Sequence, residues 1–242
     1  HACELGLTTT YRCGRAIVDV AARLVPDFQA GPNNPAGLVA NLPATKLVDT
    51  VQIGDFVLSR LNAPLVSVAM LLLRKGVRTR VAGRDIGAGL RALIRRLMKG
   101  RGATVPGLLT KLSAWEDRET ARYIAADRPN RVDAIKDQAE MLRELAQEAL
   151  SVTDLEARIN ALFADDGLGA ANVVTCSSVH RATGLEADRV FVLDDTLYCR
   201  GVNREEENIE YVAVTRAKRE LVRVSEKYVT PANVPIREYV GG

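Results

Sequence analysis

The fold is indicated by residues 190–224, whose sequence is VFVLDDTLYCRGVNREEENIEYVAVTRAKRELVRV. Val190 to Leu193 is a continuous apolar run, which is typical of a buried strand. Arg204 to Lys218 has apolar residues at helical spacing and predicts a helix, and Leu221 to Val224 predicts a further strand. Strands that alternate with helices over segments of this length indicate an α/β fold with a parallel sheet.

The same alternation is present near the start of the chain. Leu7 to Thr10 predicts a short strand, and Gly14 to Leu24 predicts a helix. Phe56 to Leu58 predicts a buried strand, followed by a helix over Ala63 to Arg74 and a strand over Val77 to Val81. Val173 and Val174 predict one more strand after the middle of the chain. The two ends of the chain are therefore expected to build one sheet.

The middle of the chain is different, because it has few β-branched residues and many Ala, Leu, Arg and Glu. Segments with helical spacing are 88–99, 105–115, 131–149 and 153–163. We therefore predict a discontinuous α/β domain over residues 1–90 and 168–242, with a small all-helical insertion over residues 91–167.

Composition excludes several classes of protein. The 242 residues include 33 Lys and Arg against 30 Asp and Glu, a net charge of +3, which is too small to establish a nucleic-acid partner. Four cysteines and two histidines, with no CxxC pair, favour reduced thiols in a cytoplasmic protein over a zinc site or a disulfide scaffold.

The chain shows no targeting or membrane segment. Its longest apolar run, Leu65 to Leu73, is far shorter than the roughly 20 residues that span a bilayer. The N-terminal residues lack the charged head and apolar stretch of a signal peptide. The absence of an initiator Met suggests a piece of a longer chain, although processing or a cloning junction would also remove it.

Four segments carry residues suited to phosphate or base contacts. Arg216 lies at the end of a predicted helix, and its forked donors suit a phosphate group, although a solvated helix-end cation is the common interpretation. His180 lies in a polar loop between two predicted strands, where α/β sheets bind ligands. Tyr11 and Arg12 precede the first helix, and Arg60 follows a strand.

Other features have an ordinary structural explanation. The basic residues Arg91, Arg95, Arg96, Lys99 and Arg101 could grip phosphates, but a solvated helix face is the more common role. Trp115 is expected in the core of the helical zone rather than on a base. Asp194 and Asp195 follow a strand and are expected to form a loop rather than a metal site. Gly83, Gly87 and Gly89 have the wrong spacing for a dinucleotide-binding fingerprint.

Together these segments resemble the second RecA-like domain of superfamily 1A DNA helicases of the UvrD/Rep type. LTTTYRCGRAI, residues 7–17, is similar to helicase motif IV, and FVLSRLNAPL, residues 56–65, to the following single-strand-contacting motif. SSVHRATGLEADRVFVL, residues 177–193, is similar to motif V. EEENIEYVAVTRAKREL, residues 205–221, is similar to motif VI and is the most specific of the four. The helical zone occupies the place of the 2B subdomain in larger members.

The resemblance implies roles for particular residues. Tyr11 would stack on adenine, and Arg12 and Arg216 would be arginine fingers that stabilise charge on the γ-phosphoryl group of ATP. Glu186, after Gly184 of the same loop, would bind the ribose. The single-stranded DNA contacts would be Arg60, Asn62, Ser178 and His180.

Motif V departs from the family pattern at two positions. Ser178 replaces a threonine and keeps its hydroxyl, whereas Thr183 replaces a lysine and removes a cation, which puts full coupling between ATP and DNA in doubt. The chain contains neither a GxxxxGK[ST] loop nor an Asp-Glu dipeptide. The phosphate cradle and the Mg²⁺ ligands would therefore belong to a missing N-terminal RecA-like domain.

The resemblance thus implies one motor half of an ATP-dependent 3′–5′ DNA helicase of bacterial or viral origin, inactive as an ATPase by itself. Such an enzyme would act in DNA repair or replication, with ATP and Mg²⁺ as cofactors. An alternative is a stand-alone single-strand-binding or protein-docking accessory domain. Such a domain would not need contacts to ribose and the γ-phosphate, so it does not explain why the chain has Arg12, Glu186 and Arg216. A helicase–nuclease is a further alternative.

Overall fold

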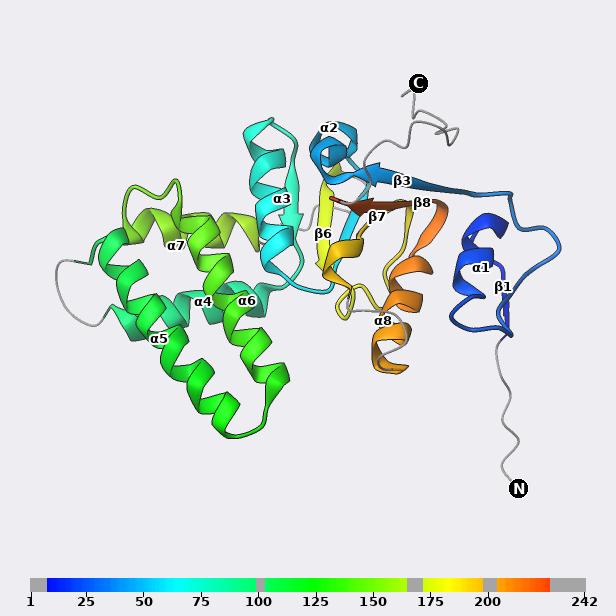
Figure 1. Ribbon diagram of the computed structural model, residues 1–242. Helices are drawn as coiled ribbons and strands as arrows, with labels where there is room; N and C mark the ends of the chain where they lie inside the picture. Colours follow the sequence, from blue (N-terminus) through cyan, green and yellow to red (C-terminus); the bar gives the residue numbers. More distant parts are fainter. Residues whose placement is uncertain (1–7, 99–102, 165–171, 198–203, 227–242) are drawn as a thin grey trace. The chain divides into compact units, whose positions relative to one another are not determined.

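The computed structural model describes residues 8–98, 103–164, 172–197 and 204–226. It divides into two compact units. The first unit consists of residues 1–60 and 178–242, and the second of residues 61–177. Figure 1 shows the elements of both with their labels. The predicted limits of the α/β domain and of the helical insertion stay a prediction.

The first unit is built on four parallel strands in the order β3-β8-β7-β4. Their bounds are Leu38–Pro43 for β3, Ala217–Ser225 for β8, Ala187–Leu193 for β7 and Phe56–Ser59 for β4. Val190 of β7 lies opposite both Leu221 of β8 and Phe56 of β4. Val190, Phe191 and Leu221 are fully buried, which is expected of parallel strands covered on both faces.

Short elements complete the first unit. They are β1 (Thr9–Thr10), β2 (Gln29–Ala30), α1 (Arg15–Ala21), η1 (Ala44–Lys46), α2 (Leu47–Thr50), η3 (Asp194–Thr196) and α8 (Arg204–Val214). β1 and β2 form a separate parallel pair. α1 buries Ile17, Val18 and Ala21, and it ends at Ala21 although the sequence predicts a helix up to Leu24.

One prediction for this unit is wrong, and one strand was not predicted. The helix expected over Arg204 to Lys218 ends at Val214, and Ala217 already belongs to β8. Its last turn is closed by the Thr215 hydroxyl, which donates to the carbonyl of Tyr211 at 2.8 Å. β3 was not expected from the sequence. It lies at one end of the strand order, where Pro43, which lacks an N–H, is tolerated.

The second unit is mainly helical. It contains α3 (Ala63–Arg74), α4 (Arg84–Leu97), α5 (Val105–Ala125), α6 (Pro129–Ala146) and α7 (Val152–Leu162). It also contains β5 (Thr79–Val81), which pairs in parallel with β6 (Val174–Ser178). Among the described residues, the four helices α4 to α7 lie between β5 and β6, as the spacing of residues 88–163 predicts.

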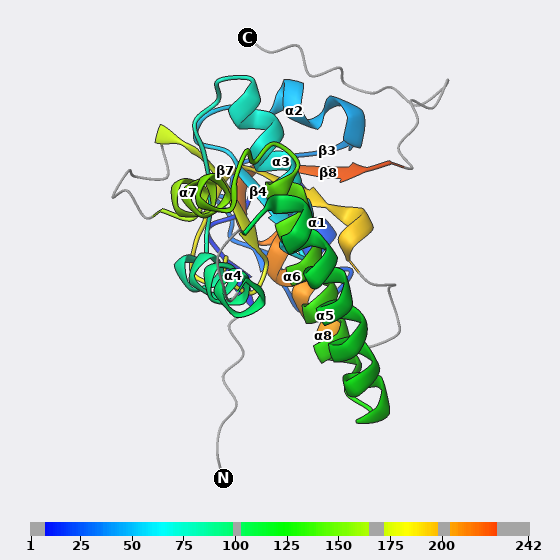
Figure 2. The ribbon, with the colours of Figure 1, turned by 90° about the vertical axis from the view of Figure 1, so that its left-hand side faces the viewer.

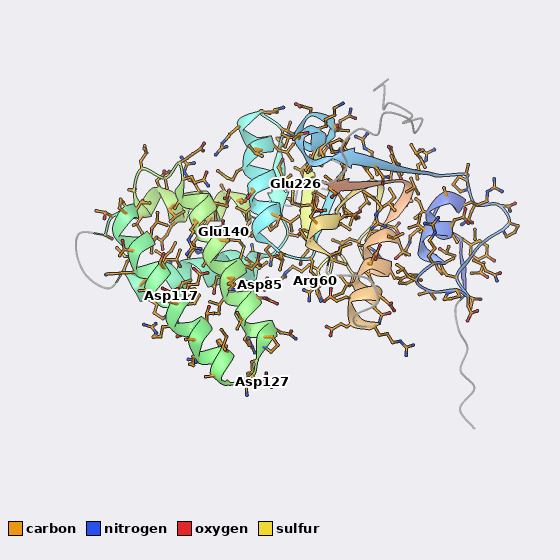
Figure 3. The ribbon with its side chains drawn as sticks, viewed as in Figure 1. Arg60, Asp85, Asp117, Asp127, Glu140 and Glu226 are labelled. Carbon is orange, nitrogen blue, oxygen red and sulfur yellow. The ribbon has the colours of Figure 1, made fainter. Side chains whose placement is uncertain are left out.

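α5 and α6 form an antiparallel helical hairpin, visible from two directions in Figures 1 and 2. The chain reverses at Asp127, which has a positive φ of 52° and is labelled at the tip of the hairpin in Figure 3. Trp115 of α5 is only 2% exposed, so its predicted place in the core is confirmed. Leu108, Leu112, Leu142 and Leu145 are fully buried between these helices and their neighbours.

The α/β class predicted from the sequence is confirmed, because parallel strands are flanked by helices in the manner of a RecA-like domain. Among the described residues, no helix combines the length and the apolar character needed to cross a bilayer.

Candidate functional site

The segment that carries Tyr11 and Arg12 joins β1 to α1 and is fixed by hydrogen bonds at both ends. The side-chain amide of Asn34 donates to the carbonyl of Thr10 at 2.9 Å and to the carbonyl of Cys13 at 2.7 Å. Asn34 is only 5% exposed. The backbone N–H of Gly14 donates to the carbonyl of Lys218 at 2.8 Å. Asn34 and Lys218 therefore hold this segment against the loop after β2 and the start of β8.

Two glycines allow the close packing of this segment. A Cβ on Gly14 would lie 2.5 Å from Cα of Gly37, so a side chain there would collide with backbone. A Cβ on Gly31 would lie 2.5 Å from Cδ1 of Tyr11. The Tyr11 ring therefore rests on the bare backbone of Gly31, and it is 76% exposed. An exposed aromatic ring held on backbone offers a face on which a planar group can stack.

Arg12, Glu186 and Lys218 form an ion cluster at the edge of the first unit. Nε of Arg12 lies 2.5 Å from one carboxylate oxygen of Glu186, and Nζ of Lys218 lies 2.6 Å from the other. The hydrogen bond from Lys218, together with the charge of Arg12, lowers the pKa of Glu186 below its usual value. One carboxylate thus holds two cations that come from β8 and from the loop before α1.

Arg216 lies in the turn between α8 and β8. Its Nε donates to the carbonyl of Val212 at 3.0 Å, and its Nη1 donates to the carbonyl of Leu185 at 3.2 Å. Burial, and then the nearby charge of Arg12, lowers the pKa of the Arg216 guanidinium. Leu185 lies between Glu186 and Gly184, whose φ is +87°. The structure therefore brings Arg12, Arg216, Glu186 and Gly184 together.

A hollow of about 660 Å³ opens beside this cluster. It is lined by Thr9, Thr10, Tyr11, Arg12, Phe28, Glu186 and Lys218. Phe28 packs edge-on against Tyr211 of α8, with ring centroids 5.3 Å apart. The hollow thus combines two aromatic rings with two cations and one carboxylate, a set that suits a ligand with both a planar and an anionic part.

The four residues expected to contact DNA are divided between the units. Arg60, labelled in Figure 3, follows β4 and pairs with Glu206 of α8 at 3.2 Å. Ser178 is buried at the end of β6, and its carbonyl accepts the N–H of Arg181. His180 is exposed in the same loop, and its carbonyl accepts the hydroxyl of Thr183 at 3.0 Å.

Asn62 belongs to the second unit. Its backbone N–H donates to Asp137 of α6 at 3.0 Å, and its side-chain amide donates to the same carboxylate at 2.9 Å. The adjacent Ala63 N–H also donates to Asp137, at 2.7 Å. The Asp137 carboxylate therefore caps the N-terminus of α3, and Asn62 is held by it.

Asp194 and Asp195 have structural partners. Asp194 pairs with Nε of Arg223 at 2.7 Å, and Arg223 also pairs with the buried Glu210 of α8 at 2.8 Å. Asp195 accepts the Ser225 hydroxyl at 2.6 Å and the N–H of Glu226, labelled in Figure 3. In the described part of the chain, no group of three His, Cys, Asp or Glu residues could hold a metal ion.

Sequence reasoning missed three residues of this site. Asn34 and Gly31 follow β2 and belong to none of the four segments that the sequence analysis singled out. Lys218 stood within the motif VI segment without a role. Lys218 is two residues after Arg216, and side chains two residues apart near the start of a strand can point to the same side. This spacing is the only sequence signal that could have indicated Lys218.

The comparisons with known proteins give one family match and one solved structure of interest. Residues 173–224 match the UvrD-like helicase C-terminal domain family, which confirms the resemblance for the motif V and motif VI segments. A search of curated proteins finds no match. One solved structure that matches is the C-terminal domain of a possible DNA helicase from Lactobacillus plantarum. It is 12% identical, with 89% of this chain and 87% of that chain covered, at a TM-score of 0.41, which is too low to carry an argument.

Proposed function

We propose, from the premise that residues 173–224 form part of a UvrD-like helicase C-terminal domain, that this chain is the second motor domain of an ATP-dependent DNA helicase. In the intact enzyme, ATP would bind between this domain and an N-terminal RecA-like domain. Opening and closing of that cleft would move the enzyme along single-stranded DNA in the 3′–5′ direction.

The observation that carries the proposal is the convergence of Arg12 and Arg216 on residues 185–186. Arg12, Lys218 and Tyr11 line one hollow together with Glu186. Arg216 does not line it, but donates to the carbonyl of Leu185, the residue next to Glu186. Fixed, forked cations suit a phosphoryl group whose charge increases during transfer. Arg12 and Arg216 would stabilise that charge, Tyr11 would stack on adenine, and Glu186 beside Gly184 would orient the ribose.

The residues that line the hollow suit the base and phosphates of ATP, but they do not suit Mg²⁺. The hollow offers aromatic rings and cations to a base and to phosphates, and ATP would supply the transferable phosphoryl group. The described residues offer no ligand cluster for Mg²⁺. The 242-residue sequence also lacks the lysine-bearing phosphate loop and the Asp-Glu pair. The metal ligands would come from the N-terminal domain, so we expect this chain to be inactive as an ATPase by itself.

The single-stranded DNA track would use Arg60, Asn62, Ser178 and His180. Arg60 is partly exposed and already pairs with a carboxylate, Glu206, so a phosphate would compete for the same guanidinium. His180 is exposed and offers a ring nitrogen. Asn62 already donates its amide to Asp137 at the N-terminus of α3, so a phosphate would compete with that carboxylate for the amide.

A second candidate function is a binding module that does not couple ATP to movement. The observation that favours it is Thr183, where a lysine is expected. Its hydroxyl donates to the carbonyl of His180 at 3.0 Å and therefore stabilises the loop instead of offering a cation. Such a module would bind single-stranded DNA or another protein.

The test is DNA-stimulated ATP hydrolysis by the chain paired with the Walker A-bearing half. Replacement of an arginine finger costs about 10³-fold or more in rate, so Arg216→Ala and Arg12→Ala should each abolish most hydrolysis. Arg219→Ala is the matched control, because Arg219 is 74% exposed and its ion pair with Asp188 is long, at 3.9 Å. Full activity of Arg216→Ala would contradict the proposal. Inactivity of the paired wild-type protein, with DNA binding intact, would favour the binding module.

A further inference from the structure

Positive charge is concentrated in the second unit. Residues 61–177 contain 18 Lys and Arg against 14 Asp and Glu, a net charge of +4. The remaining residues contain 15 against 16, a net charge of −1. The positive charge of the whole chain therefore comes from its helical unit. A polyanion would be attracted to this unit more strongly than to the unit that carries Arg12 and Arg216.

The second unit has a hollow of about 400 Å³ where α4, α5 and α6 meet. Arg96 of α4 lines it, together with Trp115, Glu119, Arg122 and Tyr123 of α5. Gln138 of α6 lies on the other side. None of these residues belongs to the site proposed for ATP or to the four residues proposed for the single-stranded DNA track.

Each arginine in the hollow lies on an aromatic ring. The guanidinium carbon of Arg96 is 5.5 Å from the centre of the Trp115 ring, and that of Arg122 is 4.6 Å from the centre of the Tyr123 ring. Arg122 also donates to the Tyr123 hydroxyl at 2.8 Å. A guanidinium stacked on a ring keeps its second planar face for another flat group, and its N–H edges for an anion.

The hollow also retains hydrogen-bonding capacity. Arg122 pairs with Glu119 at 3.1 Å, whereas Arg96 has no carboxylate partner among the described residues. The indole N–H of Trp115 is buried and finds no acceptor in the described part of the chain. Gln138 adds an amide that can both donate and accept. Because the indole N–H is closed to solvent, an oxygen-bearing ligand in the hollow would accept from Arg96 and Gln138 instead.

We infer that the hollow between α4, α5 and α6 binds a nucleotide unit of single-stranded nucleic acid. A base would stack on the outer face of the Arg96 guanidinium, and the neighbouring phosphates would take the N–H edges of Arg96 and Arg122. An acidic peptide would also satisfy the N–H edges, but it has no flat group to match the stacked guanidinium faces. The choice of single-stranded nucleic acid as the ligand rests on the proposed function, and the hollow would be a second contact site for that ligand.

Trp115 makes the test direct, because it is the only tryptophan of the chain. An oligothymidylate of about 12 nucleotides, a length that one binding module typically covers, is titrated into the chain. Trp115 emission reports events at the hollow, and the anisotropy of a labelled copy of the oligonucleotide reports binding anywhere on the chain. We expect both signals to saturate together, and inorganic phosphate alone to leave the emission unchanged.

Variants of Arg96 separate stacking from charge. Arg96→Ala should weaken oligonucleotide binding about tenfold, and Arg96→Lys, which keeps the charge and loses the planar face, about fivefold. The matched control is Arg95→Ala, because Arg95 is the adjacent residue, is 73% exposed and does not line the hollow. It should change the affinity less than twofold. Circular dichroism of each variant checks that the helices are intact.

Three outcomes would overturn the inference. Equal weakening by Arg95→Ala and Arg96→Ala would show attraction to general surface charge. Emission that changes with a polyglutamate peptide but not with the oligonucleotide would assign the hollow to acidic peptides. A rise in anisotropy without a change in Trp115 emission would place the oligonucleotide elsewhere, which would leave the proposed function standing. Conversely, weaker binding of the labelled oligonucleotide to Arg60→Ala by anisotropy, with the Trp115 emission change retained at saturation, would support both sites.

Discussion

The carboxylate of Glu186 holds Arg12, with 2.5 Å between the carboxylate oxygen and Nε of the arginine. The Arg12 side chain is 45% exposed and that of Glu186 is 32% exposed. A solvent-exposed ion pair of this kind contributes only about 0–1 kcal/mol to stability. The pair therefore orients Arg12 toward the hollow, but it is weak enough for the Arg12 guanidinium to exchange Glu186 for a phosphate. Glu186 would then keep Lys218 as its partner.

Glu186→Gln should make the chain less sensitive to acid. The hydrogen bond from Lys218, and then the charge of Arg12, lowers the pKa of Glu186 in the folded state. An acid with a lowered folded pKa stabilises the fold above its unfolded pKa, and this stabilisation is lost as the pH falls through the folded value. Urea unfolding at about pH 7 and about pH 3 should thus show a smaller loss for the variant than for the wild type.

The control for this measurement is Asp188→Asn, because Asp188 is 68% exposed and its nearest cation, Arg219, is 3.9 Å away. It should follow the wild-type acid dependence. If Glu186→Gln also followed it, the ion cluster would contribute nothing to the stability of the fold, and its role would be confined to orienting Arg12.

Asn34→Ala should destabilise the first unit by about 1–3 kcal/mol. The substitution removes both side-chain hydrogen bonds that fix the Tyr11–Arg12 segment and leaves the Cys13 carbonyl without its amide donor. Asn33→Ala is the matched control, since Asn33 is the exposed neighbour in the same loop, and it should stay within about 0.5 kcal/mol of the wild type. Urea unfolding measures both, and equal effects would show that Asn34 is an ordinary loop residue.

Gly14→Ala should be strongly destabilising, by about 3 kcal/mol, because the new methyl group would lie 2.5 Å from Cα of Gly37. Backbone cannot yield as a flexible side chain can. Gly89→Ala introduces the same methyl group inside α4, where the nearest atom is 3.9 Å away. It should stabilise the chain by about 0.5–1 kcal/mol. Thermal unfolding that shows the same sign for both variants would contradict the close approach.

Much of the fold could be predicted because apolar spacing is a local signal. Val190 to Leu193 and Leu221 to Val224 lie within β7 and β8, and α3 occupies the residues predicted for it. β3 could not be predicted, since Asn41 and Pro43 interrupt its apolar pattern and its pairing with β8 is not local. The end of α8 was placed too late because Ala217 and Lys218 continue a helical pattern that the pairing of β8 with β7 overrides.

The site was predictable only in part, for the same reason. Ala187 of β7 lies opposite Ala217 of β8, and this register brings Glu186 beside Arg216 although about thirty residues separate them. No local pattern contains that register, so their proximity was inferred only from the helicase resemblance. The role of Asn34 depends on hydrogen bonds to carbonyl groups more than twenty residues away, which neither the spacing nor the resemblance indicates.

Asp137→Ala should weaken α3 without disturbing the core. The carboxylate accepts N–H groups of Asn62 and Ala63 at the N-terminus of α3, and a lost N-cap typically costs about 1 kcal/mol. Asp133→Ala removes an exposed carboxylate from the same helix and should cost less than about 0.5 kcal/mol. Amide hydrogen exchange of Ala63, Leu65 and Val66 should be faster in the first variant alone, and equal rates in both would mean that the cap does not hold α3.

Arg189→Met should be the most destabilising of these changes. Arg189 is 7% exposed, and its guanidinium donates to both carboxylate oxygens of Asp55, at 2.9 and 2.6 Å, while it lies 5.3 Å from the centre of the Phe191 ring. Removing the arginine leaves Asp55 buried without its cation, which costs about 3–5 kcal/mol.

The double variant Asp55→Leu/Arg189→Met decides why the pair matters. Two apolar side chains can replace a buried ion pair at little cost, so the double variant should recover most of the stability that Arg189→Met loses. Recovery would be incomplete, because Asp55 also accepts the backbone N–H of Gln52 at 2.7 Å, and leucine cannot. Chemical denaturation of the wild type, both single variants and the double variant gives the coupling energy. If the double variant is as unstable as Arg189→Met, then Asp55 stabilises the fold mainly by accepting the N–H of Gln52, and its pairing with Arg189 contributes little.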